Sequence, residues 1–180
     1  MKFDRYIGID AGKGGAIAHI SSGRSAKTVL MPDSVEELDR YINYLKDISE
    51  CPIACVERVS LWRSDAAQGK AFGIEKMTRN LNEITTVLRI VKIPFIQIYP
   101  IQWQSYLNLR VTGKEEYSDR KRRLKEVAQR HFPEIKVTLT NSDALLIMEF
   151  IGLKCQREPE WVLKRLPVSI VNTLNFQGDE

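Results

Sequence analysis

The first thirty residues carry apolar side chains in short runs separated by glycine and polar residues, a pattern typical of strands joined by tight turns. Such runs occupy about residues 3–10, 14–20 and 26–31. The first run ends in Asp10, and the glycine-rich segment 11–15 leads into the second run. This spacing predicts a three-stranded antiparallel meander at the start of the chain, with Asp10 at the exit of its first strand.

After residue 31 the spacing of apolar residues alternates between that of helices and that of strands. Val35, Leu38, Ile42 and Leu45 are spaced for one face of a helix, and the polar segment 33–37 supplies its cap. The later elements follow in the order strand, long helix, strand, short helix, basic helix and apolar helix. They are expected at about residues 52–56, 66–91, 94–99, 100–107, 118–132 and 142–154.

The order of these elements predicts the fold class. Strands that are separated by a helix pair in parallel through right-handed crossovers. Two such strands added to the meander give a five-stranded mixed sheet with helices on both faces. We therefore predict an α/β protein with the architecture of the ribonuclease H-like fold.

Composition narrows the class of protein. The chain has 180 residues, 43% hydrophobic and 28% charged, which is typical of one globular domain of ordinary size. It shows no membrane-spanning run, no signal-peptide pattern and no metal-binding spacing of its three cysteines, so we expect a cytoplasmic protein with reduced thiols. Two histidines exclude a histidine-rich zinc site, and a net charge of +4 is compatible with nucleic-acid binding.

Three carboxylates fall at informative points of the predicted topology. Asp10 ends the first strand, Glu57 ends the fourth, and Asp143 lies in the first turn of the last apolar helix. The first and fourth strands would be parallel neighbours, so their carboxyl ends share the sheet edge where ligands of α/β sheets bind. Converging acids repel one another unless a cation lies between them, and oxygen ligands suit Mg²⁺ or Mn²⁺. Two such ions would serve phosphodiester hydrolysis.

Each acid also has a purely structural interpretation. Asp10 could cap the glycine-rich turn through its own backbone. Glu57 could pair with Arg58 or Arg63 on the surface. Asp143 could favour the positive end of its helix. For each residue alone, the structural alternative is at least as well supported as a metal site. The occurrence of all three acids at corresponding points of the predicted topology favours the metal site.

Several short motifs occur between residues 5 and 151. They are Ile7-Gly8-Ile9-Asp10 with Gly12, Gly15-Ala16-Ile17-Ala18, Val56-Glu57-Arg58-Val59, Tyr99-Pro100-Ile101-Gln102-Trp103 and Ser142-Asp143-Ala144-Leu145-Leu146-Ile147. In this order and spacing they resemble the RuvC family of Holliday-junction resolvases, most closely its phage-type and compact members. The last motif is the most specific of them.

The resemblance implies a homodimer that depends on Mg²⁺, with two ions in each active site, and nicks four-way DNA junctions symmetrically. It implies that Asp10, Glu57 and Asp143 are the catalytic and metal-binding acids. It places the nuclease domain at residues 1–153 and leaves 154–180 as a C-terminal extension packed on the domain or an interface. It also implies a bacterial or phage-infected cell, with no membrane partner and no nucleotide cofactor.

The chain departs from the family at one point that concerns the metal. The family usually has a fourth acid, or a histidine, a few residues before the last aspartate. The segment 137–142 contains no acid here, so Thr140 or Asn141 would have to hold a metal-bound water instead. A second departure, Ala11 where the family often has proline, is minor.

Basic and aromatic residues near the predicted acids are candidates for DNA contacts. A basic run in the helix at 118–132 is interpreted as phosphate-binding, although a solvated helix face is the alternative. Trp62 in the loop after Glu57 could stack on a base or simply pack at the edge of the core. The candidates are Lys13, Arg58, Trp62, Arg63, Lys70, Lys114, Arg120, Lys121, Arg122, Arg123 and Lys125.

Three other functions compete with junction cleavage. The missing fourth acid allows a module that binds branched DNA without cutting it. An aspartate followed by glycines also opens the phosphate-binding hairpin of sugar kinases and actin-like ATPases, but the second domain and later nucleotide motif of those enzymes are absent from this sequence. A nuclease of the same fold acting on an RNA–DNA hybrid is disfavoured only by the long apolar seam of the helix at 66–91, which suggests a dimer.

Overall fold

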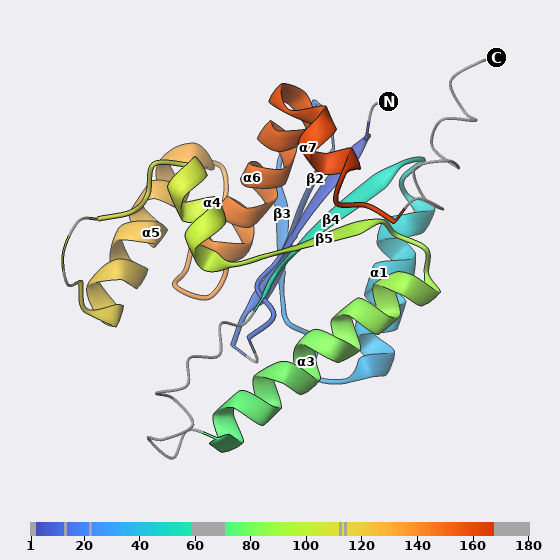
Figure 1. Cartoon of the computed structure of the whole chain (residues 1–180), viewed down its shortest axis with the longest axis horizontal. Coiled ribbons are helices and arrows are strands. Elements are labelled where there is room, and N and C mark those ends of the chain that lie inside the picture. Colours follow the sequence, from blue (N-terminus) through green and yellow to red (C-terminus); the bar gives the residue numbers. More distant parts are fainter. Residues whose placement is uncertain are drawn as a thin grey trace.

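The computed structural model describes residues 3–12, 14–21, 23–58, 71–111, 113 and 115–167, with the backbone only at 71–74 and 77. Its elements are β1 (Arg5–Ile9), β2 (Ala16–Ser21), β3 (Lys27–Leu30), α1 (Val35–Asp47), β4 (Pro52–Glu57), α3 (Ala71–Ile90), β5 (Phe95–Ile98), α4 (Pro100–Tyr106), α5 (Tyr117–His131), α6 (Ser142–Arg157) and α7 (Pro159–Leu163). Figure 1 shows their arrangement.

The strands form one five-stranded mixed sheet in the order β3-β2-β1-β4-β5. β2 pairs antiparallel with both β1 and β3, which confirms the predicted meander. β4 pairs in parallel with β1 and with β5, so the carboxyl ends of these three strands lie at the same edge. The predicted α/β class and sheet topology are therefore confirmed.

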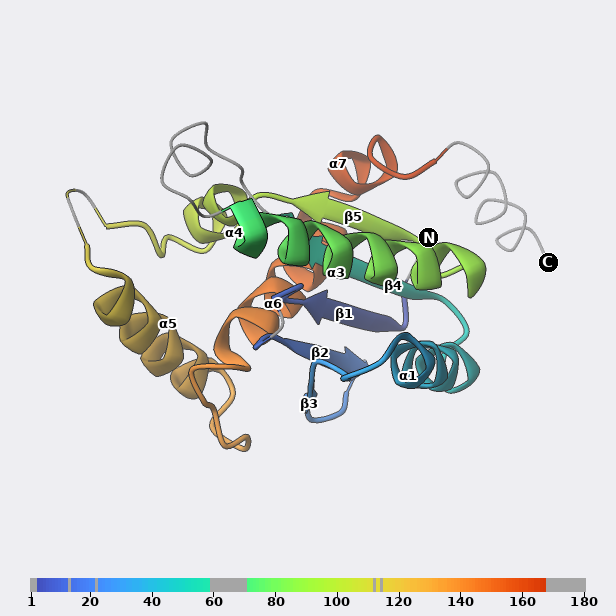
Figure 2. The same ribbon diagram turned by 90° about the horizontal axis from the view of Figure 1, so that it is seen from below.

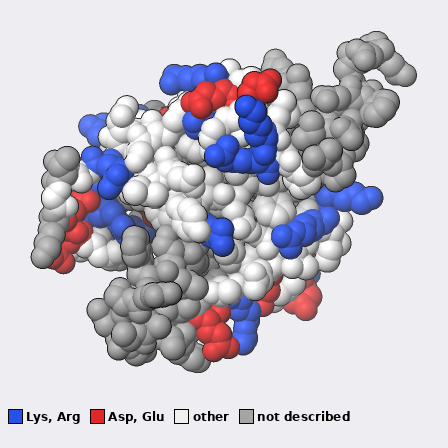
Figure 3. Space-filling view, in the orientation of Figure 1, with Lys and Arg blue, Asp and Glu red and all other residues white. Residues whose placement is uncertain are grey.

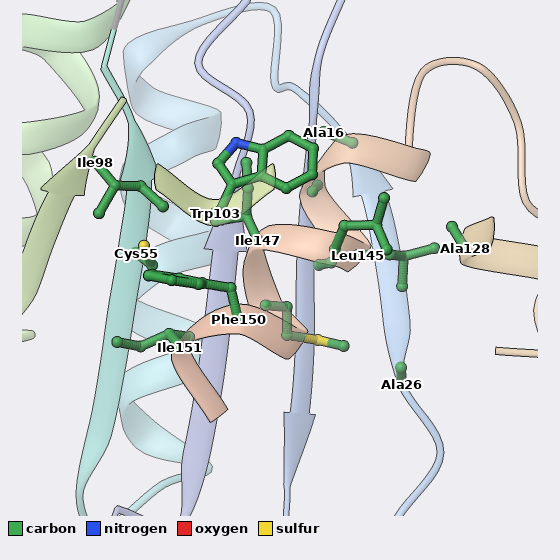
Figure 4. Packing of buried hydrophobic residues seen from close by; sticks show 14 of the residues in the cluster. Ala16, Ala26, Cys55, Ile98, Trp103, Ala128, Leu145, Ile147, Phe150 and Ile151 are labelled. Carbon is green, nitrogen blue, oxygen red and sulfur yellow. The ribbon is translucent and has the colours of Figure 1, made fainter. Parts of the chain in front are cut away.

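Helices cover both faces of the sheet (Figure 2). On one face α1 and α3 pack over Ile7, Ile9 and Val56, and they bury Ile84 and Leu88 from the predicted seam of α3. The described part of the seam therefore packs in the core against the sheet. The other face is covered by α6 together with α4, α5 and α7. Figure 4 shows Trp103, Ile147 and Phe150 in the layer between β4 and α6.

Local sequence explains where several helices begin and which faces they bury. Ser34 caps α1, because its Oγ accepts a hydrogen bond of 3.2 Å from the Glu37 amide, as predicted. α5 buries Leu124, Val127 and Ala128. α6 is apolar on nearly every side and is buried over most of its length, which also agrees with the prediction.

A glycine in β1 sets how closely α6 approaches the sheet. A Cβ atom added to Gly8 would lie 2.3 Å from both the Ala144 carbonyl oxygen and the Met148 amide nitrogen. Only a residue without a side chain leaves room for the α6 backbone at this point. Gly8 therefore places the first turn of α6, and with it Asp143, against the strand that leads to Asp10.

The C-terminal part of the described chain packs on the domain through α6 and α7. α6 continues past the predicted boundary at residue 153 and ends at Arg157. The Lys154 ammonium lies 4.0 Å from the Tyr106 ring centroid and 4.8 Å from that of Trp161, which joins α4, α6 and α7. Residues 168–180 lie outside the described part. Within the part that is described, no helix is both long and apolar enough to cross a bilayer.

Candidate active site

Asp10 follows β1 and closes the turn that leads to β2. Its Oδ1 accepts a hydrogen bond of 3.1 Å from the Gly12 amide, and its own amide donates to the Ala16 carbonyl at 3.1 Å. A Cβ atom on Gly15 would lie 2.2 Å from the Asp10 carbonyl oxygen, so the turn requires glycine there. Asp10 thus caps the turn, as its structural interpretation predicted, and this cap holds its carboxylate at the sheet edge.

Glu57 ends β4, beside the carboxyl end of β1. Its Oε1 accepts a hydrogen bond of 2.8 Å from the indole N–H of Trp103, a fully buried side chain of α4. A buried indole needs an acceptor for its N–H, and here the acceptor is a carboxylate at the sheet edge. The alternative surface pair with Arg58 does not form, because the Arg58 guanidinium lies over the Tyr99 ring at 5.2 Å from its centroid.

Asp143 lies in the first turn of α6 and is 6% exposed. Its Oδ1 accepts a hydrogen bond of 3.1 Å from the Ser142 hydroxyl, and its Oδ2 accepts one of 2.6 Å from the Lys121 ammonium of α5. The positive end of α6 favours a carboxylate at this position, as the structural interpretation predicted. The ion pair with Lys121 shows that α5 also reaches the site.

The three carboxylates share one electrostatic environment and together form what we call the carboxylate cluster. Burial raises the pKa of Asp10, and the negative charge of Asp143 raises it further. Burial also raises the pKa of Glu57 to about 8, and the charges of Asp10 and Asp143 contribute to that rise. The positive charge of Lys121 lowers the pKa of both acids. The topology therefore brings Asp10, Glu57 and Asp143 into one region, with Lys121 as a partial counter-charge.

Lys121 responds to the same charges. Burial alone would lower the pKa of its ammonium group, but the charge of Asp143 and the hydrogen bond to it outweigh that effect and raise the pKa. Asp10 adds to the rise. Lys121 therefore stays protonated beside the carboxylates, where its charge offsets part of their mutual repulsion.

A divalent cation fits the chemistry of these side chains but not their present spacing. The three acids offer only oxygen donors, and the raised pKa of Glu57 reflects burial and repulsion that a cation would offset. Among the described residues, however, no three acidic, histidine or cysteine side chains lie close enough together to hold one ion. Mg²⁺ binding would have to draw the acids inward, so the predicted metal site, with one ion or two, stays a prediction.

The two residues predicted to replace the fourth acid precede α6. The Asn141 side chain is already committed to its own loop: its Oδ1 accepts a hydrogen bond of 2.7 Å from the Thr138 amide, and its Nδ2 donates to the Thr28 hydroxyl at 3.2 Å. This leaves Asn141 poorly suited to hold a metal-bound water. Thr140 is partly exposed at the same turn and remains the better candidate.

The predicted DNA-binding residues are only partly visible. Lys13, Trp62, Arg63, Lys70 and Lys114 lie outside the described residues. Figure 3 shows the described lysine and arginine side chains in separate groups on the face it displays, with acidic side chains beside some of them. A continuous basic stripe is therefore not a feature of the described part of that face.

The basic run in α5 divides into residues with different roles. Arg123 is held by Glu115, whose two oxygens accept hydrogen bonds of 2.7 and 2.8 Å, and by the Leu109 carbonyl at 2.7 Å. This fork fixes the segment before α5, so Arg123 is primarily structural. By contrast, Arg122 is exposed and lies 3.7 Å from Asp119, a separation that makes a weak surface pair.

Two further residues of the run are less constrained. The Arg120 guanidinium lies over the exposed Tyr117 ring, 5.2 Å from its centroid, and Arg120 Nε is buried without a hydrogen-bond partner among the described residues. Lys125 is partly buried. Together with Arg122, these side chains remain candidates for phosphate contacts, whereas Lys121 is paired with Asp143 of the carboxylate cluster.

Sequence reasoning missed the role of Trp103, which it named only as the last residue of a motif. The indole does pack in the core, but its N–H also fixes one oxygen of Glu57. The signal was present in the sequence, because a buried tryptophan just after a parallel strand needs an acceptor nearby. Choosing Glu57 as that acceptor required the pairing of β4 with β5.

We expect Trp103→Phe to move the pH dependence of the site. The indole hydrogen bond lowers the pKa of Glu57, so its loss should raise that pKa by about one unit, the equivalent of about 1.4 kcal/mol. The measurement is the pKa of the Glu57 carboxyl by ¹³C NMR. The matched control is Trp161→Phe, which also removes an indole from the α6 face but should leave Glu57 unchanged. An identical Glu57 pKa in both variants would contradict the assigned role.

Comparisons with known proteins give a clear result only at the level of structure. No protein-family model matches the chain, and no curated protein matches its sequence. The structure of Thermus thermophilus RuvC in complex with a Holliday junction substrate matches with a TM-score of 0.56 and 11% identity, covering 86% of this chain and 96% of that one. A second Thermus thermophilus RuvC structure matches with a TM-score of 0.57 and 14% identity, covering 84% and 95%.

These matches define the class of fold. The chain is an α/β protein of the ribonuclease H-like type. More narrowly, its fold is RuvC-like over most of its length.

Proposed function

We propose that this protein is a structure-selective endodeoxyribonuclease that resolves four-way DNA junctions, as the phage-type RuvC enzymes do. The observation that carries the proposal is the convergence of Asp10, Glu57 and Asp143 at one edge of a RuvC-like sheet. The low identity of the solved relatives makes the fold alone insufficient, so the chemistry of this carboxylate cluster supplies the argument.

In this proposal the carboxylates bind Mg²⁺, or Mn²⁺ in its place, during phosphodiester hydrolysis. The bound metal would supply Lewis-acid stabilisation of the phosphate and a more acidic water. Asp10 and Asp143 present oxygen donors from β1 and α6, while Trp103 orients the carboxylate of Glu57. Lys121 neutralises Asp143 before the substrate arrives, and its ammonium is then placed to contact a phosphate of the cleaved strand.

We also propose that the active form is a homodimer, since a four-way junction has two-fold symmetry and requires two cuts. The outer faces of α1 and α3 form an open groove of about 850 Å³, edged by Val35 and Ile90, which are exposed. This surface would suit a second copy of the chain. Light scattering at micromolar concentration should give twice the 20.7 kDa of one chain, and a monomeric mass would argue against the dimer.

The test of the proposed function is a panel of substrates with Mg²⁺. We expect paired, symmetric nicks in an immobile four-way junction, and no cleavage of a linear duplex or an RNA–DNA hybrid of the same sequence. Preferential cleavage of the hybrid would assign the site to a different nuclease. Tight junction binding without nicks, in Mg²⁺ or Mn²⁺, would favour the non-cleaving binding module and make the missing fourth acid the explanation.

A further inference from the structure

A polar cavity lies at the end of the sheet opposite the carboxylates. Arg5 begins β1, whereas Asp10 follows the last residue of that strand, and Figure 2 shows α1 beside the start of β1. The cavity has a volume of about 560 Å³, within the range of about 300–1,000 Å³ typical of small-molecule sites. Its lining includes the charged residues Asp4, Arg5, Arg24 and Lys27, and also His19.

Arg5 is a buried cation whose partners are all neutral. The side chain is 6% exposed, and its guanidinium contacts Ser49 Oγ, His19 Nδ1 at 2.8 Å and the Ile48 carbonyl at 3.1 Å. The Ile48 carbonyl belongs to the C-terminal end of α1, whose partial negative charge offsets only part of a full positive charge. Buried charges are normally paired with an opposite charge, so Arg5 lacks the counter-ion that its burial calls for.

The surrounding groups add positive charge instead of neutralising it. Arg24 and Lys27 are exposed at the cavity, and no ion pair joins Arg5, Arg24 or Lys27 to an acid within the described ranges. The acid in the lining, Asp4, accepts hydrogen bonds of 2.9 Å from the amides of Glu50 and Cys51. Its carboxylate is therefore occupied in joining β1 to the start of β4.

His19 fits an anion site because its ring is neutral and carries a hydrogen-bond donor. Its Nδ1 lies 2.8 Å from the Arg5 guanidinium, which can only donate, so Nδ1 accepts and the neutral ring carries its proton on Nε2. Burial lowers the pKa of His19 to about 4, and the positive charges of Arg5 and Lys27 contribute to that shift. The ring thus remains neutral and able to donate one hydrogen bond beside three cations.

We propose that this cavity binds a phosphate group through Arg5, Arg24 and Lys27, with His19 as a neutral donor. A phosphate oxyanion would supply the counter-charge that Arg5 lacks, and a guanidinium is the group best shaped to bind it. The phosphate could belong to the backbone of a DNA arm or to a free phosphate compound. The proposal does not depend on nuclease activity, because the cavity is separate from the carboxylate cluster.

The experiment is an NMR titration of the ¹⁵N-labelled full chain with inorganic phosphate at constant ionic strength. We expect saturable shifts of the His19 ring and Arg5 Nε–H signals, with the affinity reduced at least tenfold in the double variant Arg24→Glu, Lys27→Glu. Both substituted residues are exposed, so the variant should fold, and its melting temperature checks this. The double variant Lys136→Glu, Lys164→Glu makes the same change in net charge at two exposed positions outside the cavity, so it is the charge-matched control and should bind like the wild type.

A second titration uses a short DNA duplex and separates the two sources of phosphate. Shifts at His19 with the duplex but not with inorganic phosphate, lost in the double variant, would assign the site to the DNA backbone. Saturation by inorganic phosphate, with no effect of the double variant on duplex binding, would assign it to a free phosphate compound. Shifts that grow linearly with both ligands, or that are unchanged in the double variant, would overturn the proposal.

Discussion

Glu57→Gln should abolish metal-dependent cleavage and at the same time stabilise the metal-free protein at pH 8. The carboxylate of Glu57 is partly buried beside two other acids, and its pKa in the folded protein is about 8, against an ordinary value of 4.5. An uncharged amide of the same shape removes that repulsion and still accepts the Trp103 hydrogen bond. Under the proposed function cleavage should fall by about 10³-fold, because a proposed ligand of the metal and an element of charge stabilisation are lost together.

The direction of the stability change follows from the raised pKa. Between about pH 4.5 and 8 the unfolded chain has lost the Glu57 proton while the folded protein keeps it, so the stability of the wild type falls as pH rises through this window. The amide of the Glu57→Gln variant does not titrate, so this loss would be absent. We expect the variant to gain about 2 kcal/mol of unfolding free energy at pH 8. A pKa difference corresponds to about 1.4 kcal/mol per unit, but the full difference would overstate the gain because solvent reaches the side chain.

The measurement is denaturant unfolding of both proteins at pH 5 and pH 8 in EDTA. The stabilisation should be large at pH 8 and small at pH 5. Glu149→Gln is the matched control, since Glu149 pairs with His131 on the surface and not with the carboxylate cluster. A Glu57→Gln variant that is equally or less stable than wild type at pH 8 would show that Glu57 is not held in a repulsive environment.

The second large effect is expected from Gly8→Ala in β1. A Cβ atom there would lie 2.3 Å from backbone atoms of α6, which no side-chain rotation can relieve. α6 must therefore move away from the sheet, opening the core and displacing Asp143. We expect a loss of about 3 kcal/mol of unfolding free energy, or roughly 6–12 °C in melting temperature, together with loss of cleavage.

Gly14→Ala makes the same substitution a few residues away and is the control. A Cβ atom on Gly14 has no neighbour within 4 Å, so this variant should unfold close to the wild-type temperature. If Gly8→Ala were as stable as Gly14→Ala, the result would contradict the close contact between the α6 backbone and Gly8 of β1.

The sheet and most helices could be predicted because their signals are local. Alternating and apolar runs locate the strands, and the Ser34 cap and the apolar circumference of α6 depend on residues that are near one another in the sequence. Strand ends shift by one or two residues, since pairing stops where the partner strand ends. α7 could not be predicted, because its five residues carry too little periodicity to stand out.

The positions of the acids could also be predicted, but their partners could not. The sequence groups Lys121 with several other candidate phosphate-binding cations, whereas its bond to Asp143 depends on how α5 packs against α6. The Trp103–Glu57 bond joins residues 46 positions apart through the β4–β5 pairing. Asn141, which was predicted as one of two residues that could hold a metal-bound water, ties its own loop to β3 through Thr28. Such long-range choices leave no pattern in one sequence.

The most direct test of a carboxylate-dependent junction nuclease compares wild type with Asp10→Asn on an immobile four-way junction in Mg²⁺, with junction binding measured separately in EDTA. We predict paired symmetric nicks by the wild type, and a loss of about 10³-fold in Asp10→Asn with binding retained. Nicking that persists in Asp10→Asn, or in EDTA, would contradict the account, and so would a wild type that binds the junction tightly and never cuts it.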